Sequence, residues 1–358
     1  MNVPLENPIR PGKKYRLPTA VLGGDLSLDG GQLFAGCMDG IYSVDFRNGE
    51  KQKLDTHESY VSSVCRAGEN QLISAGYDGG LQWFDLQQKK RIRRVQAHQF
   101  WSWQMAISPD RKIIASVTGQ YLAGDYDYRP AAQTEPCVKV FDAQNGKPLH
   151  QFPHVPSVQA VAISADSKHV AAANLMGEVR VYELAAGKQV AKWVTPDFTS
   201  WGIIKSHCNI GGIYDMQFAP DGNHLHVCGM GIMRDPMAGN GKQLWQKFAW
   251  RETEPKKVDQ THAGESGEGL METLAVHPGG KHFLMAGRLR GGSWNAALFE
   301  MESGKLVQSL KTGCRVTHAV FSETGNQLVL LGGQGQPRSK NGKTRSFGRV
   351  DCFEVHLG

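Results

Sequence analysis

The sequence predicts an all-β fold, a seven-bladed β-propeller of four-stranded antiparallel blades whose ring is closed by an N-terminal strand in the last blade. Two short sequence patterns alternate along the 358 residues. Together they mark seven similar units, each with the strands of one blade. The chain also ends one strand short of a complete seventh unit, while a spare strand precedes the first unit.

The first pattern is a strand followed by a tight turn. In VKVFDAQNGK (138–147), apolar residues alternate up to Phe141, Asp142 follows, and Asn145 and Gly146 form a turn signal. Alternation with a period of two is typical of a half-buried strand, and Gly and Asn adopt positive φ at low cost. Related segments are IYSVDFRNGEK (41–51), LQWFDLQQKK (81–90), VRVYELAAGK (179–188) and AALFEMESGK (296–305), with looser copies QLWQKFAW (243–250) and RVDCFEV (349–355).

The second pattern is a turn between two apolar strands, upstream of each copy of the first. Each unit therefore runs strand, turn, strand, connection, strand, turn, strand. A lone four-stranded sheet cannot cover both of its faces, but seven sheets stacked in a ring cover one another. The turns are SLDGGQ (27–32), AGENQ (67–71), SPDRK (108–112), SADSK (164–168), APDGN (219–223), HPGGK (277–281) and SETGN (322–326).

The two ends of the chain are expected to meet in one blade. After RVDCFEV, the third strand of the seventh unit, only three residues remain. The segment KYRLP (14–18) precedes the inner strand of the first unit and is predicted to be the missing outer strand of blade seven. This pairing would close an open sheet edge. We therefore expect residues 1–13 to be a tail and residues 14–358 to be one propeller domain.

The repeats resemble those of the WD-repeat (WD40) family, whose third strand ends in Trp-Asp. This chain has FD at 84–85 and 141–142, YE at 182–183, and FE at 299–300 and 353–354. His57, His98 and His154 lie near the position of the family's Gly-His pair. In the family this His bonds an Asp after the second strand, so the resemblance implies a network of His57, Ser74 and Asp78 in blade two. It covers about residues 14–356 and implies a fold rather than a function.

Long connections are expected on a single face. Strands alternate in direction, so connections from second to third strands and from blade to blade emerge on one face, here called the loop-rich face. The tight turns emerge on the opposite, plain face. Long loops on a rigid scaffold are where binding residues concentrate. The long connections are 118–137 (blade three), 230–242 (five), 287–295 (six) and 332–349 (seven), with 194–211 between blades four and five and about 251–269 between five and six.

Charge supports a binding role for these loops. The four connections within blades carry −2, +1, +2 and +5, which equals the formal net charge of +6 of the whole chain. Arginine and aromatic side chains together suit an acidic peptide, a phosphopeptide or a nucleic-acid backbone. Arg349 belongs to the same basic stretch of blade seven. The predicted partner-binding residues are Tyr121, Arg129, Trp201, Arg234, Arg288, Arg290, Trp294, Arg338, Lys340, Lys343, Arg345 and Phe347.

The sequence favours a non-enzymatic scaffold that presents this basic and aromatic face to a protein or an acidic or phosphorylated peptide. It predicts no catalytic residue, cofactor or metal. One alternative is an enzyme, because propellers with similar repeats include lactonases and other hydrolases with a site at the channel mouth; His207, Arg234 and Asp235 would then be candidates. A second alternative is single-stranded nucleic acid bound on the basic loops.

Other residues are expected to be structural. His224, His226 and Cys228 are of metal-ligand type but alternate along one strand, and a buried strand face explains them better. Trp101 and Trp103 are expected to begin the inner strand of blade three, as core or channel-rim aromatics. The seven cysteines are dispersed without a CxxC pair, which indicates reduced thiols.

The sequence also leads to an expectation about cellular location and membrane insertion. It has no apolar run of about 18 residues, so no membrane span is expected. The N-terminus lacks the apolar core of a signal peptide. We expect a monomeric cytoplasmic protein, with a mature exported chain carrying an added Met as the alternative.

Overall fold

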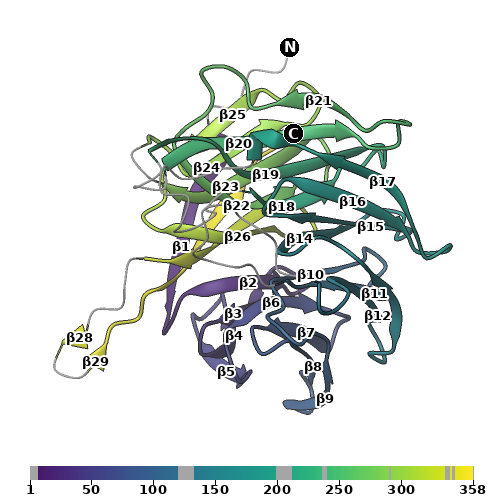
Figure 1. Ribbon diagram of the computed structural model, residues 1–358. Helices are drawn as coiled ribbons and strands as arrows, with labels where there is room; N and C mark the ends of the chain where they lie inside the picture. The colour runs from purple at the N-terminus through teal and green to yellow at the C-terminus, as the bar shows by residue number, and fades with distance from the viewer. Residues whose placement is uncertain are drawn as a thin grey trace.

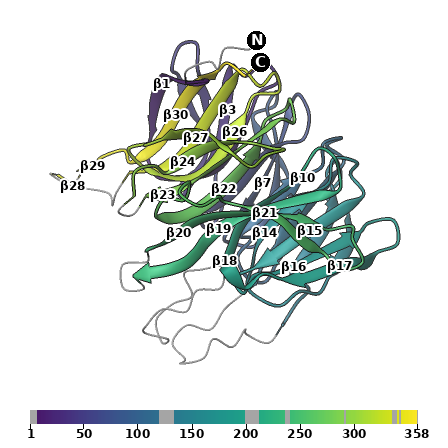
Figure 2. The same ribbon diagram turned by 90° about the horizontal axis from the view of Figure 1, so that it is seen from above.

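The computed structural model describes residues 7–119, 133–198, 212–235, 240–289, 292–334, 339–340 and 343–357. Its strands form seven four-stranded sheets and one two-stranded hairpin. The sheets stand as blades around a central axis, and the strand at residues 9–17 lies beside the strand at residues 348–355 (Figures 1 and 2). The predicted seven-bladed propeller is confirmed. Among the described residues the one helix is a 3₁₀ turn, Pro196–Phe198, and no helix there has the length and apolarity that a membrane crossing needs.

The first four blades each contain four consecutive strands, ordered from the channel outward. Blades one and two contain β2 (Val21–Leu26), β3 (Gln32–Cys37), β4 (Gly40–Asp45), β5 (Lys51–Asp55), β6 (Val61–Arg66), β7 (Gln71–Gly76), β8 (Gly80–Asp85) and β9 (Lys90–Gln96). Blades three and four contain β10 (Gln104–Ile107), β11 (Ile113–Val117), β12 (Val138–Asp142), β13 (Pro148–Phe152), β14 (Val158–Ile163), β15 (His169–Asn174), β16 (Glu178–Glu183) and β17 (Lys188–Val194).

The last three blades follow the same plan, except that blade seven takes its outer strand from the N-terminus. Blades five and six contain β18 (Gly212–Phe218), β19 (His224–Asp235), β20 (Asn240–Ala249), β21 (Lys256–Gln260), β22 (Gly269–Val276), β23 (His282–Leu289), β24 (Ala296–Glu300) and β25 (Leu306–Leu310). Blade seven contains β26 (Arg315–Phe321), β27 (Gln327–Gly333), β30 (Gly348–Val355) and β1 (Ile9–Leu17), and β28 (Ser339–Lys340) and β29 (Lys343–Thr344) form the small hairpin.

The ring closes through the predicted N-terminal strand. β1 pairs antiparallel with β30, from Ile9 opposite Val355 to Leu17 opposite Gly348. Strand pairing begins at Ile9, five residues before the start of the expected domain, because Ile9 and Leu17 are both fully buried and anchor the two ends of the strand. The Gln308 side chain of blade six also bonds both the amide and the carbonyl of Ile9, at 2.8 and 2.9 Å.

The tight turns have the backbone that the sequence pattern predicts. In the turns between third and fourth strands, Gly49, Gly146, Gly187 and Gly304 have φ of 77°, 70°, 62° and 67°. A side chain at such a φ would be strained, which explains why the repeated turns carry glycine at this point.

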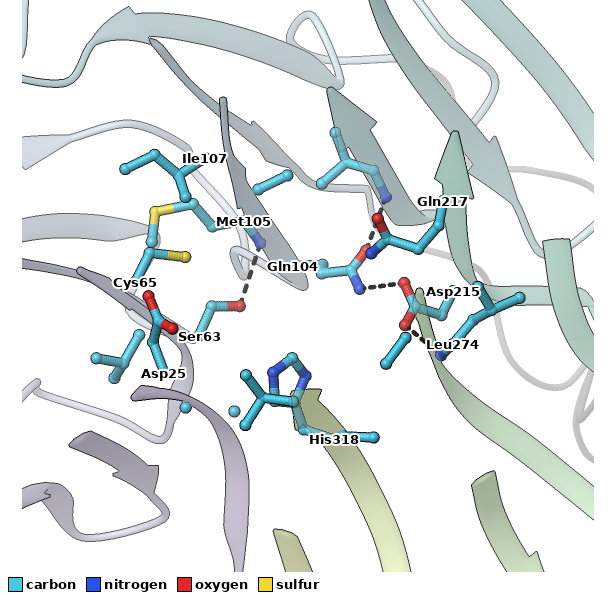
Figure 3. A pocket seen from close by; sticks show the side chains of 18 of the residues that line it. Asp25, Ser63, Cys65, Gln104, Met105, Ile107, Asp215, Gln217, Leu274 and His318 are labelled. Atoms are coloured by element: carbon cyan, nitrogen blue, oxygen red, sulfur yellow. Dashed lines mark hydrogen bonds between the residues drawn. The ribbon is translucent and has the colours of Figure 1, made fainter. Parts of the chain in front are cut away.

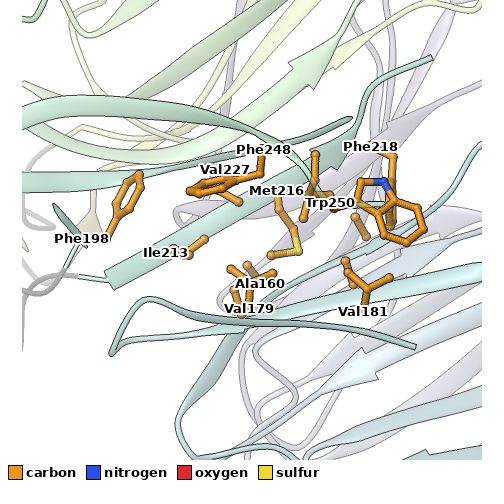
Figure 4. Close-up of a cluster of buried hydrophobic side chains, with 14 residues drawn as sticks. Ala160, Val179, Val181, Phe198, Ile213, Met216, Phe218, Val227, Phe248 and Trp250 are labelled. Carbon is orange, nitrogen blue, oxygen red and sulfur yellow. The ribbon is translucent and has the colours of Figure 1, made fainter. Parts of the chain in front are cut away.

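Apolar side chains from facing blades fill the seams between them. The seam of blades four and five is an example, in which Val179 and Val181 meet Met216, Val227 and Phe248 (Figure 4). These five side chains are at most 3% exposed. Burial of each large apolar side chain stabilises the fold by roughly 1.5–3 kcal/mol, so the seams hold the ring together.

Two of the expected long connections are shorter in the structure. In blade five, β19 and β20 extend toward each other, so the predicted connection 230–242 is reduced to 236–239. The expected link 251–269 is wrong in part: it contains the outer strand β21, and only 261–268 joins blades five and six. The sequence hides β21 because an outer strand exposes most of its residues and lacks apolar alternation; KKVDQ has four exposed positions in five.

We expect the N-terminal strand to be essential for stability. Deletion of residues 1–18 should lower the unfolding free energy by at least about 4 kcal/mol, because the buried side chains of Ile9 and Leu17 are each worth about 2–5 kcal/mol. Thermal melting followed by circular dichroism measures the loss. Deletion of residues 1–6 alone, which leaves β1 intact, is the control and should change the melting temperature little. Equal melting temperatures for both deletions would contradict the role of β1.

Candidate partner-binding surface at the channel mouth

The structure describes only some of the predicted binding residues. Tyr121, Arg129, Trp201, Arg290 and Arg338 lie outside the described residues, as does His207 of the enzyme alternative. For Arg234, Asp235, Lys340 and Lys343 the backbone is described, in β19, β28 and β29. The β28–β29 hairpin projects away from the ring (Figures 1 and 2). The role of all these residues in binding or catalysis stays a prediction.

Four of the predicted residues have described side chains, and they differ in accessibility. Arg345 is exposed, and Phe347 and Arg288 are half-buried. Trp294 is only 6% exposed and belongs to the core between blades five and six, where its ring meets Phe299 edge-on at 6.4 Å. The structure therefore leaves Arg345 the most accessible of the four.

The expected charge of the loops is wrong at Arg349. It lies in β30 rather than in a loop, and it is 7% exposed. Its guanidinium is bound to both carboxylate oxygens of Asp351 at 2.9 Å and to Gln334 at 3.0 Å. This buried pair is neutral as a unit, so Arg349 adds no free charge to the loop-rich face.

The central channel is a cavity of about 650 Å³ lined by the inner strands. Six of these strands carry a one-residue β-bulge, and each extra residue lines the channel. A bulge turns a side chain that would otherwise enter a seam. The six residues are Leu22, Ser62, Gln159, Tyr214, Glu272 and Thr317.

A buried carboxylate sits in the channel wall (Figure 3). Asp215 accepts hydrogen bonds from Gln104 Nε2 at 2.9 Å, from the Leu274 amide at 2.7 Å and from the Met216 amide at 2.8 Å. Burial raises the pKa of Asp215 to about 6, although these hydrogen bonds act in the opposite direction. Because both oxygens are engaged, this carboxylate ties blades three, five and six together rather than offering itself to a ligand.

An ion pair lies at the mouth of the channel on the loop-rich face. Arg315, the first residue of β26, makes two bonds of 2.7 Å to the carboxylate of Glu272, the bulge residue of blade six. The Arg315 side chain is 51% exposed and that of Glu272 is 7% exposed. The carboxylate raises the pKa of Arg315, so the guanidinium stays charged. Like the Arg349–Asp351 pair, this pair is neutral as a unit, but it holds a half-exposed arginine side chain in a fixed position at the mouth.

Beside this ion pair stands a cluster of aromatic rings. Trp101 is stacked between Tyr77, at 4.8 Å, and Phe100, at 4.9 Å. Trp103 meets Trp101 edge-on at 5.0 Å, and Tyr60 lies against Tyr77 at 5.9 Å. Trp101 and Tyr60 are 39% and 42% exposed. We call these five residues the aromatic cluster.

Sequence reasoning placed only part of this cluster. Trp101 and Trp103 precede β10, which begins at Gln104, so they lie in a blade-to-blade connection and not in the inner strand. The motif HQFWSW (98–103) places three aromatic rings in this connection. By the same alternation of strand direction, that connection emerges on the loop-rich face. Its density of aromatics was the signal that could have identified it.

The histidine network implied by the family resemblance is present in blade two. His57 Nδ1 lies 3.0 Å from Asp78 Oδ1, and His57 Nε2 lies 2.9 Å from Ser74 Oγ. Burial raises the Asp78 pKa, but the hydrogen bond and charge of His57 outweigh it and hold this pKa well below its usual range. His57 and Ser74 are buried, so this Ser-His-Asp arrangement gives a substrate no access and acts as a structural bond.

Two of the three residues of metal-ligand type form part of the core, as predicted. His226 and Cys228 are fully buried on β19, and the His226 ring packs against Phe283 at 4.9 Å. His224 instead bonds Asp221 at 2.5 Å. Within the described ranges no three His, Cys, Asp or Glu side chains gather as a metal site.

The fold and the histidine network define a WD40-like seven-bladed propeller. No protein-family model matches the chain. Among curated proteins, the chain is similar to telomerase protein component 1 of the rat, with 28% identity over 177 residues, and of the mouse, with 26% identity over 178 residues. Each match covers 49% of this chain and 6% of the relative's length.

His226 should make stability depend on pH. Burial lowers the pKa of His226 to about 3, against about 6.5 for an unfolded chain, so the unfolded state binds the proton first as pH falls. The contribution of His226 to stability is complete above about pH 6.5 and is lost below it by about 1.4 kcal/mol per pH unit. In His226→Leu this part of the loss should disappear, while the part due to other buried histidines such as His98 and His154 should remain; urea unfolding of both proteins at pH 7, 6 and 5 measures the difference.

The control for this substitution is its effect at neutral pH. Neither ring nitrogen of His226 has a hydrogen-bond partner in the described structure, so His226→Leu should cost little at pH 7. A difference in unfolding free energy between the two proteins that stays constant from pH 7 to pH 5 would contradict the prediction.

Proposed function

We propose that the protein is a non-enzymatic binding scaffold that holds a protein or acidic peptide on its loop-rich face. The observation that carries this proposal is the aromatic cluster beside the channel mouth. Two of its rings are exposed although a folded chain gains by burying them. Exposed, pre-stacked aromatic side chains are the residue type that supplies most binding energy in protein interfaces.

The electrostatics of the same face favour an acidic partner. Arg315 stands at the channel mouth next to Tyr77 and Tyr214, and its side chain is half-exposed, so it can donate hydrogen bonds to a carboxylate although Glu272 balances its charge. Arg345 adds an exposed cation, and the predicted cations Arg338, Lys340 and Lys343 belong to the same connection of blade seven. Charges at the edge of an interface act mainly on association rate and orientation, while the aromatic cluster supplies affinity.

The similarity to known proteins is in keeping with a scaffold. The rat and mouse relatives are named as a protein component of telomerase, that is, as part of a larger assembly. A hydrolase would need a nucleophile or metal that a substrate can reach. The Ser74–His57–Asp78 arrangement fails this requirement because it is buried.

The aromatic cluster should be the anchor. Peptides selected by the intact protein from a displayed library should lose at least about tenfold in affinity for Trp101→Ala, since an interface hot spot is worth about 2 kcal/mol or more. Isothermal titration with the selected peptides measures this. Leu28→Ala is the matched control, because Leu28 is 49% exposed but lies in a turn of the plain face. Equal losses in the two variants would overturn the assignment of the face.

The basic connection of blade seven should act on association rate. Combined reversal of Arg338, Lys340, Lys343 and Arg345 to Glu should slow binding of the same peptides and flatten its dependence on salt, because exposed charges are screened. Surface plasmon resonance at 50 to 300 mM salt separates the association rate from the dissociation rate. An unchanged association rate at every salt concentration would remove these residues from the site.

A further inference from the structure

The outer strands of the propeller carry an uneven charge. β1, β5 and β9, the outer strands of blades seven, one and two, have formal charges of +4, +1 and +4. The outer strands of the other four blades, β13, β17, β21 and β25, carry 0, +2, +1 and 0. The three adjacent strands thus carry +9, more than the +6 of the whole chain.

These three strands form one continuous surface. β1 is tied to blade one because Lys13 Nζ and Tyr15 Oη both donate to the carbonyl of Phe46, at 3.1 and 3.0 Å. β9 is tied to blade one because the Arg91 guanidinium bonds the carboxylate of Asp55 at 2.7 and 2.9 Å. The outer strands of blades seven, one and two are therefore consecutive along the rim of the propeller.

Most of the charge on this surface has no acidic partner. Three cations are paired with carboxylates: Arg91 with Asp55, Arg94 with Glu58 and Asp78, and Lys53 with Asp39 at 3.8 Å. The other cations of the three strands make no ion pair within the described part of the chain. We call these seven residues the basic rim: Arg10, Lys13, Lys14, Arg16, Lys51, Lys90 and Arg93.

We propose that the basic rim binds the phosphate backbone of nucleic acid without reading its sequence. The surface is separate from the loop-rich face, so it adds a second binding site to the scaffold. Seven unpaired cations on adjoining strands would release the counterions of the phosphates that they bind, which is the main source of affinity in binding of this kind. Exposed lysine and arginine stems can also move to meet a flexible backbone.

Two features favour nucleic acid over an acidic protein. A protein interface needs apolar anchors at its centre, and Ile92 is the one large apolar residue of these strands that is strongly exposed, at 41%. Alternate residues of a strand lie about 7 Å apart, which is close to the phosphate spacing of an extended single strand. The rim thus offers distributed charge in place of a hydrophobic anchor.

The test is a comparison of two variants with equal net charge. In the rim variant Arg10, Lys14, Arg16 and Lys90 are changed to Gln. In the matched control Lys188, Lys256, Lys305 and Lys311, which make no ion pair in the described part of the chain and lie on or next to the outer strands of blades four, five and six, are changed to Gln. All eight side chains are exposed, so both variants should have the same melting temperature as the intact protein.

Fluorescence anisotropy with a labelled 20-nucleotide single strand of random sequence, at 50 to 300 mM salt, measures binding. The rim variant should bind at least about tenfold more weakly at 100 mM salt, and the slope of log K against log salt should fall by about 0.7 for each phosphate that the variant no longer binds. The control should bind as the intact protein does. Equal weakening of the two variants, or no binding at 50 mM salt, would overturn the proposal.

A second measurement separates the two classes of polyanion. Polyglutamate competes for the same charge but has no phosphates. If it displaces the labelled strand at equal or lower charge concentration, the rim is a site for acidic protein and the proposal is wrong. If the rim variant has a lower melting temperature than the intact protein, the double variant Lys14→Gln, Lys90→Gln takes its place. A partial loss of affinity is still expected for this double variant.

Discussion

The pairing of β1 with β30 is the interaction on which the rest of the structure depends. Each blade packs its apolar faces only against its two neighbours, so an open ring would leave two apolar blade faces in water. Ile9 and Leu17 fix the ends of the closing strand in the core, and Gln308 holds its first residue from the neighbouring blade. Because β1 joins residues 9–17 to residues 348–355, the first and last parts of the chain become a single blade.

Closure in turn imposes a fixed geometry on the inner strands. At six of the seven seams a hydrogen bond joins a side chain of one inner strand to the backbone of the next inner strand. The six bonds are Arg66 N to Asp25, Met105 N to Ser63, Val161 N to Gln104, Leu274 N to Asp215, Ala319 N to Thr273, and Thr317 Oγ1 to Val21 O. In blade four the matching position after the bulge is Ala160. The side chain of Ala160 has no polar atom for such a bond. Gln104 of blade three instead donates to Asp215 of blade five, so these two blades are linked directly. The channel wall is thus a continuous polar belt, and the bulges beside it turn Glu272 and Tyr214 toward the channel.

Features that repeat along the sequence or involve residues close in sequence could be predicted. Features that depend on which strands become neighbours in the fold could not. The seven units were visible in repeated residue types, the closing strand in the strand missing from the last unit, and the His57 network in the resemblance to WD repeats. β21 was missed because KKVDQ is too exposed to alternate, and Arg349 was counted as a loop cation because Asp351 follows it two residues later on a buried strand. The basic rim was invisible because residues 10–16, 51 and 90–93 are far apart in sequence and meet only after the ring closes.

The two proposed surfaces follow from the two ways in which a propeller exposes its chain. The loop-rich face can carry stacked rings such as Tyr77, Trp101 and Phe100, because a connection is free to adopt the backbone that stacking needs. An outer strand has no such freedom: half of its side chains point outward at a fixed spacing, and its open edge must be protected from pairing with other chains. Lysine and arginine provide that protection. Edge protection requires charge on every blade, however, and β13 and β25 carry none, so it does not explain why β1 and β9, on the two sides of blade one, carry +4 each.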